Sequence, residues 1–351
     1  MAFNIAGLNE SEGFRVVTIN DVARVAGVSP ATVSRVVNGK GKVGDACRAR
    51  VQKIIQELGY KPNVSAQSLV NRHTTNVGLI TPKISMEFFG NLAAGAEVSA
   101  RDVGYSLLIC NSLYEEESEI AAIESLHAKG CESIILHSDY LTDKQLIELS
   151  ERYKGLVIIN RYIPKIASRC VWFDNVASTA QIVDLLASKG HEAIAVATSI
   201  YQNRDPQQRL LGVRQGFMMQ GLTFNDNLLV ESTANLEGGK ACAQELIQRG
   251  EPFTAVIAYN DLMAVGVIHE LVKNGYKVPE QVSVVGFDDS AMCRACIPTI
   301  TTIKYPIEEM AEYAVKLAID LAKDAATPEN KTHLFTSSMI ERESVVEISH
   351  S

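Results

Sequence analysis

No stretch of this 351-residue chain has the run of about 18 apolar residues that a membrane-spanning helix needs. The first fifteen residues, MAFNIAGLNESEGFR, lack the basic start, the apolar middle and the small-residue cleavage site of a secretory signal. We expect residues 1–17 to be a disordered extension. These absences predict a protein that stays in the cytoplasm and has no membrane partner.

Cysteine is scattered rather than paired, with seven residues dispersed along the chain. An odd, dispersed set predicts reduced, mostly buried thiols and not a disulfide framework. Cys293 and Cys296 have the C-x-x-C spacing, but no second pair completes a zinc site. We therefore predict no metal site.

Motifs for common enzyme chemistry are also missing. The sequence contains no P-loop, no Gly-x-Ser-x-Gly, no His-Glu-x-x-His and no dinucleotide-binding fingerprint, and its seven histidines share no pattern. These absences argue against an enzyme and predict that the protein binds no cofactor.

Acidic charge dominates, and the formal net charge of −8 argues at first against a nucleic-acid partner. The charges are unevenly placed, however, because residues 18–73 contain nine Lys or Arg against three acids. A basic segment at one end of an acidic chain is the electrostatic pattern of phosphate binding confined to that end. The length also suits two or three domains rather than a single core.

The basic segment is predicted to form three short helices. The first covers about 19–26. The second begins after Ser29, a good N-cap, with Pro30 at the first helical position, and the third covers about 45–58. Two short helices joined by a tight turn and followed by a third are typical of a helix-turn-helix. Residues 18–62 are therefore predicted to be a DNA-binding headpiece.

Beyond a linker at residues 63–74, the pattern changes to apolar strand runs that alternate with helical stretches. Strands are predicted at 77–81, 106–110, 133–136, 156–159, 194–197, 255–258 and 283–286, and helices at 88–103, 115–129, 176–189, 207–220, 237–249, 260–274 and 306–323. This alternation predicts an α/β core over 75–351, built as two doubly wound parallel-sheet lobes. The first lobe is placed at about 75–174 plus 304–340, and the second at about 175–303.

Several stretches together resemble the LacI/GalR family of repressors over about residues 18–345. They are TINDVARVAGVSPATVSRVVN at 18–38, GYKPN at 59–63, AQSL at 66–69, INR at 159–161, YND at 259–261, GFDD at 286–289 and TTIKYP at 301–306. INRYIP and KYPIEEMA look most like the galactose repressor and isorepressor branch. The family implies a homodimer and a core like that of periplasmic sugar-binding proteins, with the ligand between the two lobes.

A dimer of helix-turn-helix units reads two half-sites, so the expected partner is double-stranded DNA with a palindromic operator. Pro30 and Ala31 can offer only apolar contact to base edges, whereas Arg35 can bind guanine bidentately. Donors suited to phosphates are Thr18, Ser29, Thr32, Ser34, Asn38 and Lys42. Ser29 serves as an N-cap as well, and Ser34 is equally well explained as a solvated side chain.

The family also implies that residues 63–74 form a hinge helix on DNA and that Leu69 wedges into the minor groove, where apolar wedges kink the duplex. The alternative is that Leu69 packs on the core. A ligand that moves the first lobes of the dimer apart would separate the hinge helices, but only through its differential affinity for the two states.

Effector-binding candidates come from the resemblance and lie at the carboxyl ends of strands or at helix N-termini. They are Phe88, Phe89, Asn160, Arg161, Arg209, Asn260 and Asp288, with Trp172, the single tryptophan, as a further candidate. We expect Arg209, Asn260 and Asp288 to bond sugar hydroxyls while an aromatic side chain stacks on the ring. Other interpretations stay open. Arg161 can be an ion-pair partner, Asp261 a helix cap or dipole partner, and one of the two phenylalanines core.

The sequence therefore predicts a repressor of sugar-utilisation genes that is released from, or tuned on, its operator by a small sugar, galactose or a related hexose. A pentose, nucleoside or purine effector and a role as activator stay open. A transport binding protein is rejected because it would have a signal peptide and no basic headpiece. We expect a dimer rather than a tetramer, because no heptad tail follows Glu343.

Overall fold

The computed structural model describes residues 17–39, 41–60, 75–201, 203–324 and 332–348. The chain divides into two compact units between residues 74 and 75. No helix among the described residues is long and apolar enough to cross a membrane. All seven cysteines are unbridged, and four of them are buried.

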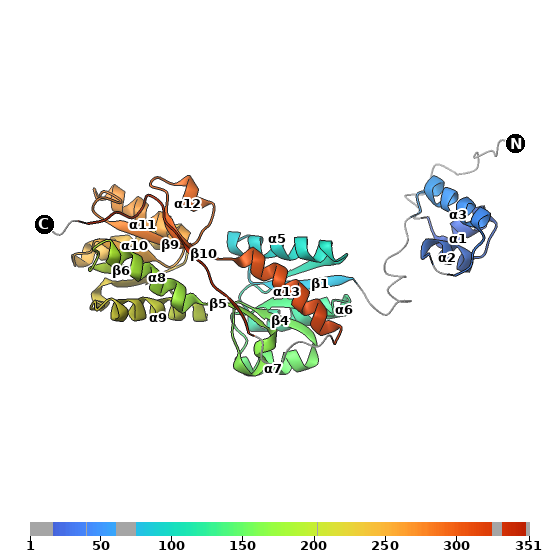
Figure 1. Cartoon of the computed structure of the whole chain (residues 1–351), viewed down its shortest axis with the longest axis horizontal. Coiled ribbons are helices and arrows are strands. Elements are labelled where there is room, and N and C mark those ends of the chain that lie inside the picture. Colours follow the sequence, from blue (N-terminus) through green and yellow to red (C-terminus); the bar gives the residue numbers. More distant parts are fainter. Residues whose placement is uncertain (1–16, 40, 61–74, 202, 325–331, 349–351) are drawn as a thin grey trace. The chain divides into compact units, whose positions relative to one another are not determined.

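The described part of the first unit contains α1 (Ile19–Ala26), α2 (Pro30–Val37) and α3 (Asp45–Leu58), which confirm the predicted helix-turn-helix (Figure 1). Its core is made of small apolar side chains from all three helices: Val22, Ala23, Ala26, Val33, Val36, Val51 and Ile54. Both of the first two helices begin at a hydroxyl cap. Thr18 forms a capping box with Asp21, and Ser29 accepts a hydrogen bond from Thr32 N at 3.2 Å.

The second unit has two lobes, and the first is built on a parallel six-stranded sheet in the order β11-β5-β4-β3-β1-β2. The strands are β1 (Asn76–Thr81), β2 (Ser106–Asn111), β3 (Ser133–His137), β4 (Gly155–Ile159), β5 (Cys170–Phe173) and β11 (His333–Phe335). The helices are α5 (Glu87–Asp102), α6 (Glu116–Ala128), α7 (Asp143–Arg152) and α13 (Ile307–Ala322), with a 3-10 turn η1 (Pro164–Arg169).

Helix α13 lies beside α5 although about 200 residues of chain separate them (Figure 1). The close approach depends on Gly95, because a Cβ atom there would lie 2.5 Å from the Glu308 carbonyl oxygen. Packing against this helix places the residues that precede α13, including Tyr305, at the junction of the two lobes.

The second lobe repeats the design in a sheet of order β12-β10-β9-β8-β6-β7. Its strands are β6 (Ile194–Ser199), β7 (Leu229–Ser232), β8 (Ala255–Ala258), β9 (Ser283–Asp288), β10 (Thr301–Lys304) and β12 (Met339–Ile340). Its helices are α8 (Asn175–Ser188), α9 (Arg204–Met219), α10 (Leu236–Arg249), α11 (Asp261–Lys273) and α12 (Met292–Ala295), with a 3-10 turn η2 (Asp226–Leu228). The inner strands β6, β8 and β9 are almost continuously buried, as expected when helices cover both faces of a parallel sheet.

The chain crosses between the lobes three times, and the last crossing corrects the expected boundary of the first lobe. We expected residues 304–340 in that lobe, but β12 pairs antiparallel with β10 in the second lobe. The segment that follows stays there, because Val284 N donates to the Ser344 carbonyl oxygen at 2.9 Å. A two-residue strand carries too little alternation for sequence periodicity to assign it to a sheet.

Candidate functional site

The recognition helix α2 presents two distinct faces. Val33 and Val36 are buried in the headpiece core, while Pro30, Ala31 and Arg35 are exposed. A helix exposed along one face is the element that enters a major groove. The three residues predicted to face base edges therefore all lie on accessible surface.

Five of the six predicted phosphate donors also hydrogen-bond within the headpiece. Thr18 Oγ1 donates to Asp21 Oδ2 at 2.7 Å, the Ser29 and Thr32 hydroxyls lie 2.9 Å apart, and Asn38 Nδ2 donates to Ser34 Oγ at 3.2 Å. Hydroxyl and amide groups keep further bonding capacity for a phosphate. Lys42, the sixth donor, is exposed. The predicted hinge at 63–74, with Leu69, lies outside the described residues.

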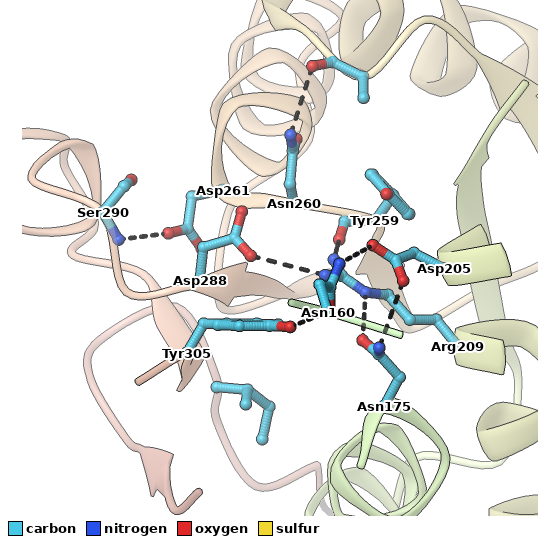
Figure 2. A network of polar contacts seen from close by, with 12 residues as sticks. Asn160, Asn175, Asp205, Arg209, Tyr259, Asn260, Asp261, Asp288, Ser290 and Tyr305 are labelled. Carbon is cyan, nitrogen blue, oxygen red and sulfur yellow. Dashed lines mark hydrogen bonds and ion pairs between the residues drawn. The ribbon is translucent and has the colours of Figure 1, made fainter. Parts of the chain in front are cut away.

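Arg209 on α9 is the centre of the cleft between the two lobes of the core (Figure 2). Its side chain is only 8% exposed. Nε donates to Asn175 Oδ1 at 3.1 Å, and Nη1 donates to the Tyr259 carbonyl oxygen. The guanidinium also lies 3.7 Å from the ring centroid of Phe287, within cation–π range. Arg209 is thus held in one orientation before any ligand arrives.

Asp288 at the end of β9 faces Arg209, but its Oδ1 receives no hydrogen bond from that arginine. Arg209 Nη2 lies 3.6 Å from Asp288 Oδ1, which is an ion pair but too long for a hydrogen bond. Oδ1 is buried, and no donor among the described residues bonds to it. A buried polar atom without a partner is unfavourable, so this oxygen is available to a ligand hydroxyl.

Two half-buried carboxyl groups, those of Asp205 and Asp288, act on this guanidinium, and the buried carboxyl of Asp261 acts on Asp288. Burial raises the pKa of Asp288 to about 8, although the charge of Arg209 opposes the rise. Burial likewise raises the pKa values of Asp205 and Asp261. The Arg209 cation is already shared with carboxyl groups, which disfavours an anionic ligand, whereas neutral hydroxyls can pair with both.

Asn160, which follows β4, links the two lobes at the floor of the cleft (Figure 2). Its Nδ2 donates to Asp205 Oδ2 at 2.9 Å, and its Oδ1 accepts a hydrogen bond from Tyr305 Oη. The backbone has φ 62°, a left-handed conformation that Asn tolerates better than most residues.

Further contacts join the rims of the cleft. They are Asn203 Nδ2 to Asp139 Oδ1 at 3.2 Å, Arg204 Nη2 to Asp143 Oδ2 at 2.8 Å, and Ala291 N to Glu87 Oε1 at 2.9 Å. In each pair one residue belongs to the first lobe and the other to the second, so these contacts hold the lobes closed.

Aromatic side chains form one wall of the cleft. Phe88 is half-buried, and its ring centroid lies 5.1 Å from that of Tyr305 in an edge-to-face arrangement. Phe89 is 6% exposed and belongs to the apolar core. Phe89 is thus the more buried of the two, and both phenylalanines line the 70 Å³ cavity.

Three cavities lie along the cleft, with volumes of about 630, 360 and 70 Å³. Residues of both lobes line the largest, among them Phe88 from the first lobe and Asn260 and Asp288 from the second. A volume of this size is typical of small-molecule sites, which span about 300–1,000 Å³. Among the described residues, no group of three or more His, Cys, Asp or Glu side chains is arranged to hold a metal ion.

Comparison with known proteins bears on both units. Residues 18–63 match the lacI family of bacterial regulatory proteins, and residues 183–345 match the periplasmic binding protein-like domain. The HTH-type transcriptional regulator GalS of Salmonella typhimurium (strain LT2) is 38% identical over 331 residues, covering 94% of this chain and 97% of GalS. The chain belongs to the LacI family of bacterial regulatory proteins.

Other members of the LacI family agree with this assignment. The HTH-type transcriptional regulator GalR of Escherichia coli K12 is 37% identical over 93% of this chain and 95% of GalR. The crystal structure of the lac repressor dimer bound to operator and the anti-inducer ONPF covers 95% of this chain, with a TM-score of 0.86 at 25% identity. The chain is thus a DNA-binding transcriptional repressor of the LacI/GalR type and not an enzyme.

In this LacI-family core, Asn260 and Arg161 are already engaged within the protein. Asn260 caps α11, where its Oδ1 accepts from Met263 N at 2.9 Å, and its Nδ2 donates to the Ala234 carbonyl oxygen at 3.3 Å. Arg161 Nη2 donates to Asp143 Oδ1 at 2.7 Å. Arg161 is therefore an ion-pair partner, as one of the two interpretations proposed. The same side chain also lines the 360 Å³ cavity.

Asp261 is not the cap of α11 but its first residue. Its carboxylate accepts hydrogen bonds from Ser290 N and Thr302 Oγ1, each at 2.7 Å. The side chain is buried and lies in the first helical turn, where the helix dipole stabilises a negative charge.

The structure corrects the inclusion of Trp172 among the effector-binding residues. Trp172 lines none of the three cavities. It packs against Tyr162 in a tilted arrangement with ring centroids 4.9 Å apart, and it donates from Nε1 to Thr332 Oγ1 at 3.0 Å. Successive side chains of a strand point to opposite faces. Since Val171 and Phe173 pack in the cluster that borders the cleft, Trp172 faces the other side of β5.

Sequence reasoning missed several residues that build the cleft. Asn175, Asp205, Tyr259 and Tyr305 all contact Arg209 or Asn160, and His137 lines two of the cavities. Asn175 and Asp205 stand at the first turns of α8 and α9, where a signal was available, because helix N-termini beside parallel strands are where such folds bind ligands.

Proposed function

We propose that the protein is a homodimeric repressor of sugar-utilisation genes that binds a palindromic operator and is controlled by a neutral sugar, galactose or a closely related hexose. No cofactor or metal takes part in this scheme, and the protein acts in the cytoplasm. The observation that carries the proposal is the pair formed by Arg209 and Asp288 in an aromatic-walled cleft shared by both lobes.

This pair suits a sugar for specific reasons. Asp288 Oδ1 is buried, has no hydrogen-bond donor in the described part of the chain and can accept from a hydroxyl, while Arg209 is fixed in place to donate. Phe88 offers a ring to the apolar face of a pyranose. The Arg209 guanidinium is already shared with Asp288 and Asp205, which favours a neutral ligand over a sugar phosphate.

The relatives support the galactose assignment and the DNA partner. GalS and GalR, both at 37–38% identity, cover nearly the whole chain. The solved lac repressor dimer on its operator supports a dimeric arrangement for this chain as well. On this scheme Pro30, Ala31 and Arg35 read base edges, and Thr18, Ser29, Thr32, Ser34, Asn38 and Lys42 bind phosphates.

The test is thermal unfolding and calorimetric titration of the full-length protein with galactose, glucose, a pentose, a nucleoside and a purine. A cleft ligand at about 100 times its Kd stabilises the protein by about 2.7 kcal/mol through mass action. We expect a galactose-selective response that Asp288→Asn abolishes and Asp226→Asn, an exposed carboxyl with an ion-pair partner, leaves intact. A response to the pentose or purine alone would overturn the galactose assignment.

The same preparation distinguishes an inducer from a corepressor. An operator fragment is first selected by the wild-type protein from a randomised DNA library, and its affinity is then measured with and without the effector. We expect the effector to lower operator affinity. A rise in affinity would instead make the sugar a corepressor.

A further inference from the structure

The turn that follows the recognition helix contains two glycines with left-handed backbone conformations. Gly39 has φ 64° and Gly41 has φ 86°. This region of φ is unfavourable for most other residues, which explains both glycines as turn residues. The two positions differ, however, in what surrounds them.

A side chain at Gly41 would meet Arg35. An ideal Cβ atom there would lie 3.3 Å from Arg35 Cδ, 3.5 Å from Cγ and 3.8 Å from Nε. At Gly39, and also at Gly27, Gly44 and Gly59, the same atom would meet nothing within 4 Å. Among the described headpiece glycines, Gly41 alone lies against the stem of another side chain.

The stem of Arg35 lies beside Gly41, in space that a side chain at that position would share. The residue is exposed on α2, and neither described ion pair of the headpiece includes it. A long, free side chain samples many rotamers and loses that freedom when it binds. Bidentate recognition of guanine needs the guanidinium plane in one orientation, so a surface that confines the stem reduces this loss.

We propose that Gly41 is a positioning residue for base recognition. The missing side chain leaves the space in which the stem of Arg35 lies, and the turn therefore helps to aim the guanidinium at a base edge. The inference rests on the proposed operator binding and on Arg35 as the residue that reads a guanine.

Asparagine substitutions test the idea because Asn tolerates positive φ and thus adds a Cβ atom with little backbone strain. The variants are Gly41→Asn, the matched control Gly39→Asn, Arg35→Ala and the double variant of Arg35→Ala with Gly41→Asn. Each full-length protein is titrated against the operator selected by the wild type and against single base-pair changes of it. The melting temperature of each variant shows whether the headpiece still folds.

We expect Arg35→Ala to abolish discrimination at one G·C pair, a loss of roughly 10- to 100-fold. Gly41→Asn should weaken discrimination at that same pair, with the other positions and the affinity for random DNA unchanged. In the double variant no further loss should follow, and Gly39→Asn should behave as wild type. Replacing that guanine by 7-deazaguanine, which removes N7, should cost the wild type more than Gly41→Asn.

Different failures point to different errors. If Gly41→Asn keeps full discrimination at the pair that Arg35 reads, or if Gly39→Asn loses as much, Gly41 does not position Arg35. If Arg35→Ala changes no base preference, the assigned role of Arg35 is wrong and this inference fails with it. If the wild type selects no sequence at all, the operator binding of the proposed function fails instead.

Should Gly41→Asn lower the melting temperature of the headpiece, Gly41→Ala gives the second measurement. Its methyl group still meets the stem of Arg35. A loss of discrimination at the Arg35 pair by a folded Gly41→Ala variant supports the proposal, and full discrimination by that variant overturns it.

Discussion

Asn160 of the first lobe donates from Nδ2 to Asp205 Oδ2 of the second lobe, 2.9 Å away. This hydrogen bond joins the two halves of the core at the floor of the cleft. Because Tyr305 donates to the other side of the same amide, Asn160 is held by both partners at once. Asn160 therefore couples the state of the cleft to the distance between the lobes, together with the contacts at the rims.

Asn160→Asp is expected to open the cleft, because a carboxylate would replace the donor and face the Asp205 carboxylate. Effector affinity should fall further than in Asn160→Gly, which removes the amide without adding charge and keeps the left-handed φ. Calorimetric titration with the ligand that the wild type binds gives the affinities, and small-angle scattering reports the lobe separation. Equal affinities for the two variants would contradict the coupling.

Replacing Arg209 should destabilise the core strongly. Arg209→Met removes the donor to Asn175 Oδ1 and to the Tyr259 carbonyl oxygen, and each buried acceptor left without a donor costs about 1–3 kcal/mol. Arg214→Met, on the same helix, removes an exposed ion pair with Asp226 and should cost about 0–1 kcal/mol. Urea unfolding compares the two. A loss as small as that of Arg214→Met would mean that the arginine does not hold the cleft together.

Asp288 makes stability depend on pH. Burial raises its pKa to about 8, so the folded protein keeps a proton that the unfolded chain releases near pH 4. The stabilising contribution is therefore complete below the unfolded pKa and is lost as the pH rises toward 8. Between pH 5 and pH 8 the wild type should lose more stability than Asp288→Asn, which cannot titrate. Parallel curves for the two proteins would show that Asp288 is ionised throughout.

Glu119 stabilises the loop at Ser138 and Asp139, which borders the cleft. Its buried carboxylate accepts hydrogen bonds from Ser138 Oγ at 2.6 Å and Asp139 N at 3.1 Å, in the loop that carries Asp139 into the cleft. Glu119→Ala leaves these donors buried and should cost about 1–3 kcal/mol and lower effector affinity. Glu117→Ala, exposed on the same helix, should change neither quantity. Thermal unfolding and titration of both variants check the expectation.

Lys42 and Arg35 should have different roles in DNA binding. Lys42→Ala should lower affinity for all sequences alike and reduce the slope of log K against log salt by about 0.9, as the loss of one phosphate contact requires. Lys144→Ala removes an exposed cation of the core and serves as the control. Salt titrations on the selected operator and on random DNA measure both slopes. A sequence-selective effect of Lys42→Ala would place it among the base contacts.

The three helices of the headpiece could be predicted from the sequence alone, because their starts depend on neighbouring residues. Ser29 followed by Pro30 is a helix start by itself, and the capped helix formed where expected. The long apolar strands and amphipathic helices of the core were equally readable, because a parallel α/β lobe repeats one pattern many times. Arg209, Asp288 and Phe88 could be named because the resemblance to the family implied them.

Only the tertiary structure decided which residues meet in the cleft. Asn175 and Asp205 carry no motif, and they reach Arg209 and Asn160 because two lobes close on each other. Trp172 was misjudged because the face of a strand depends on register, which one residue reverses. The short β12 joined the second lobe through pairing with β10, a contact between distant segments that local periodicity cannot encode.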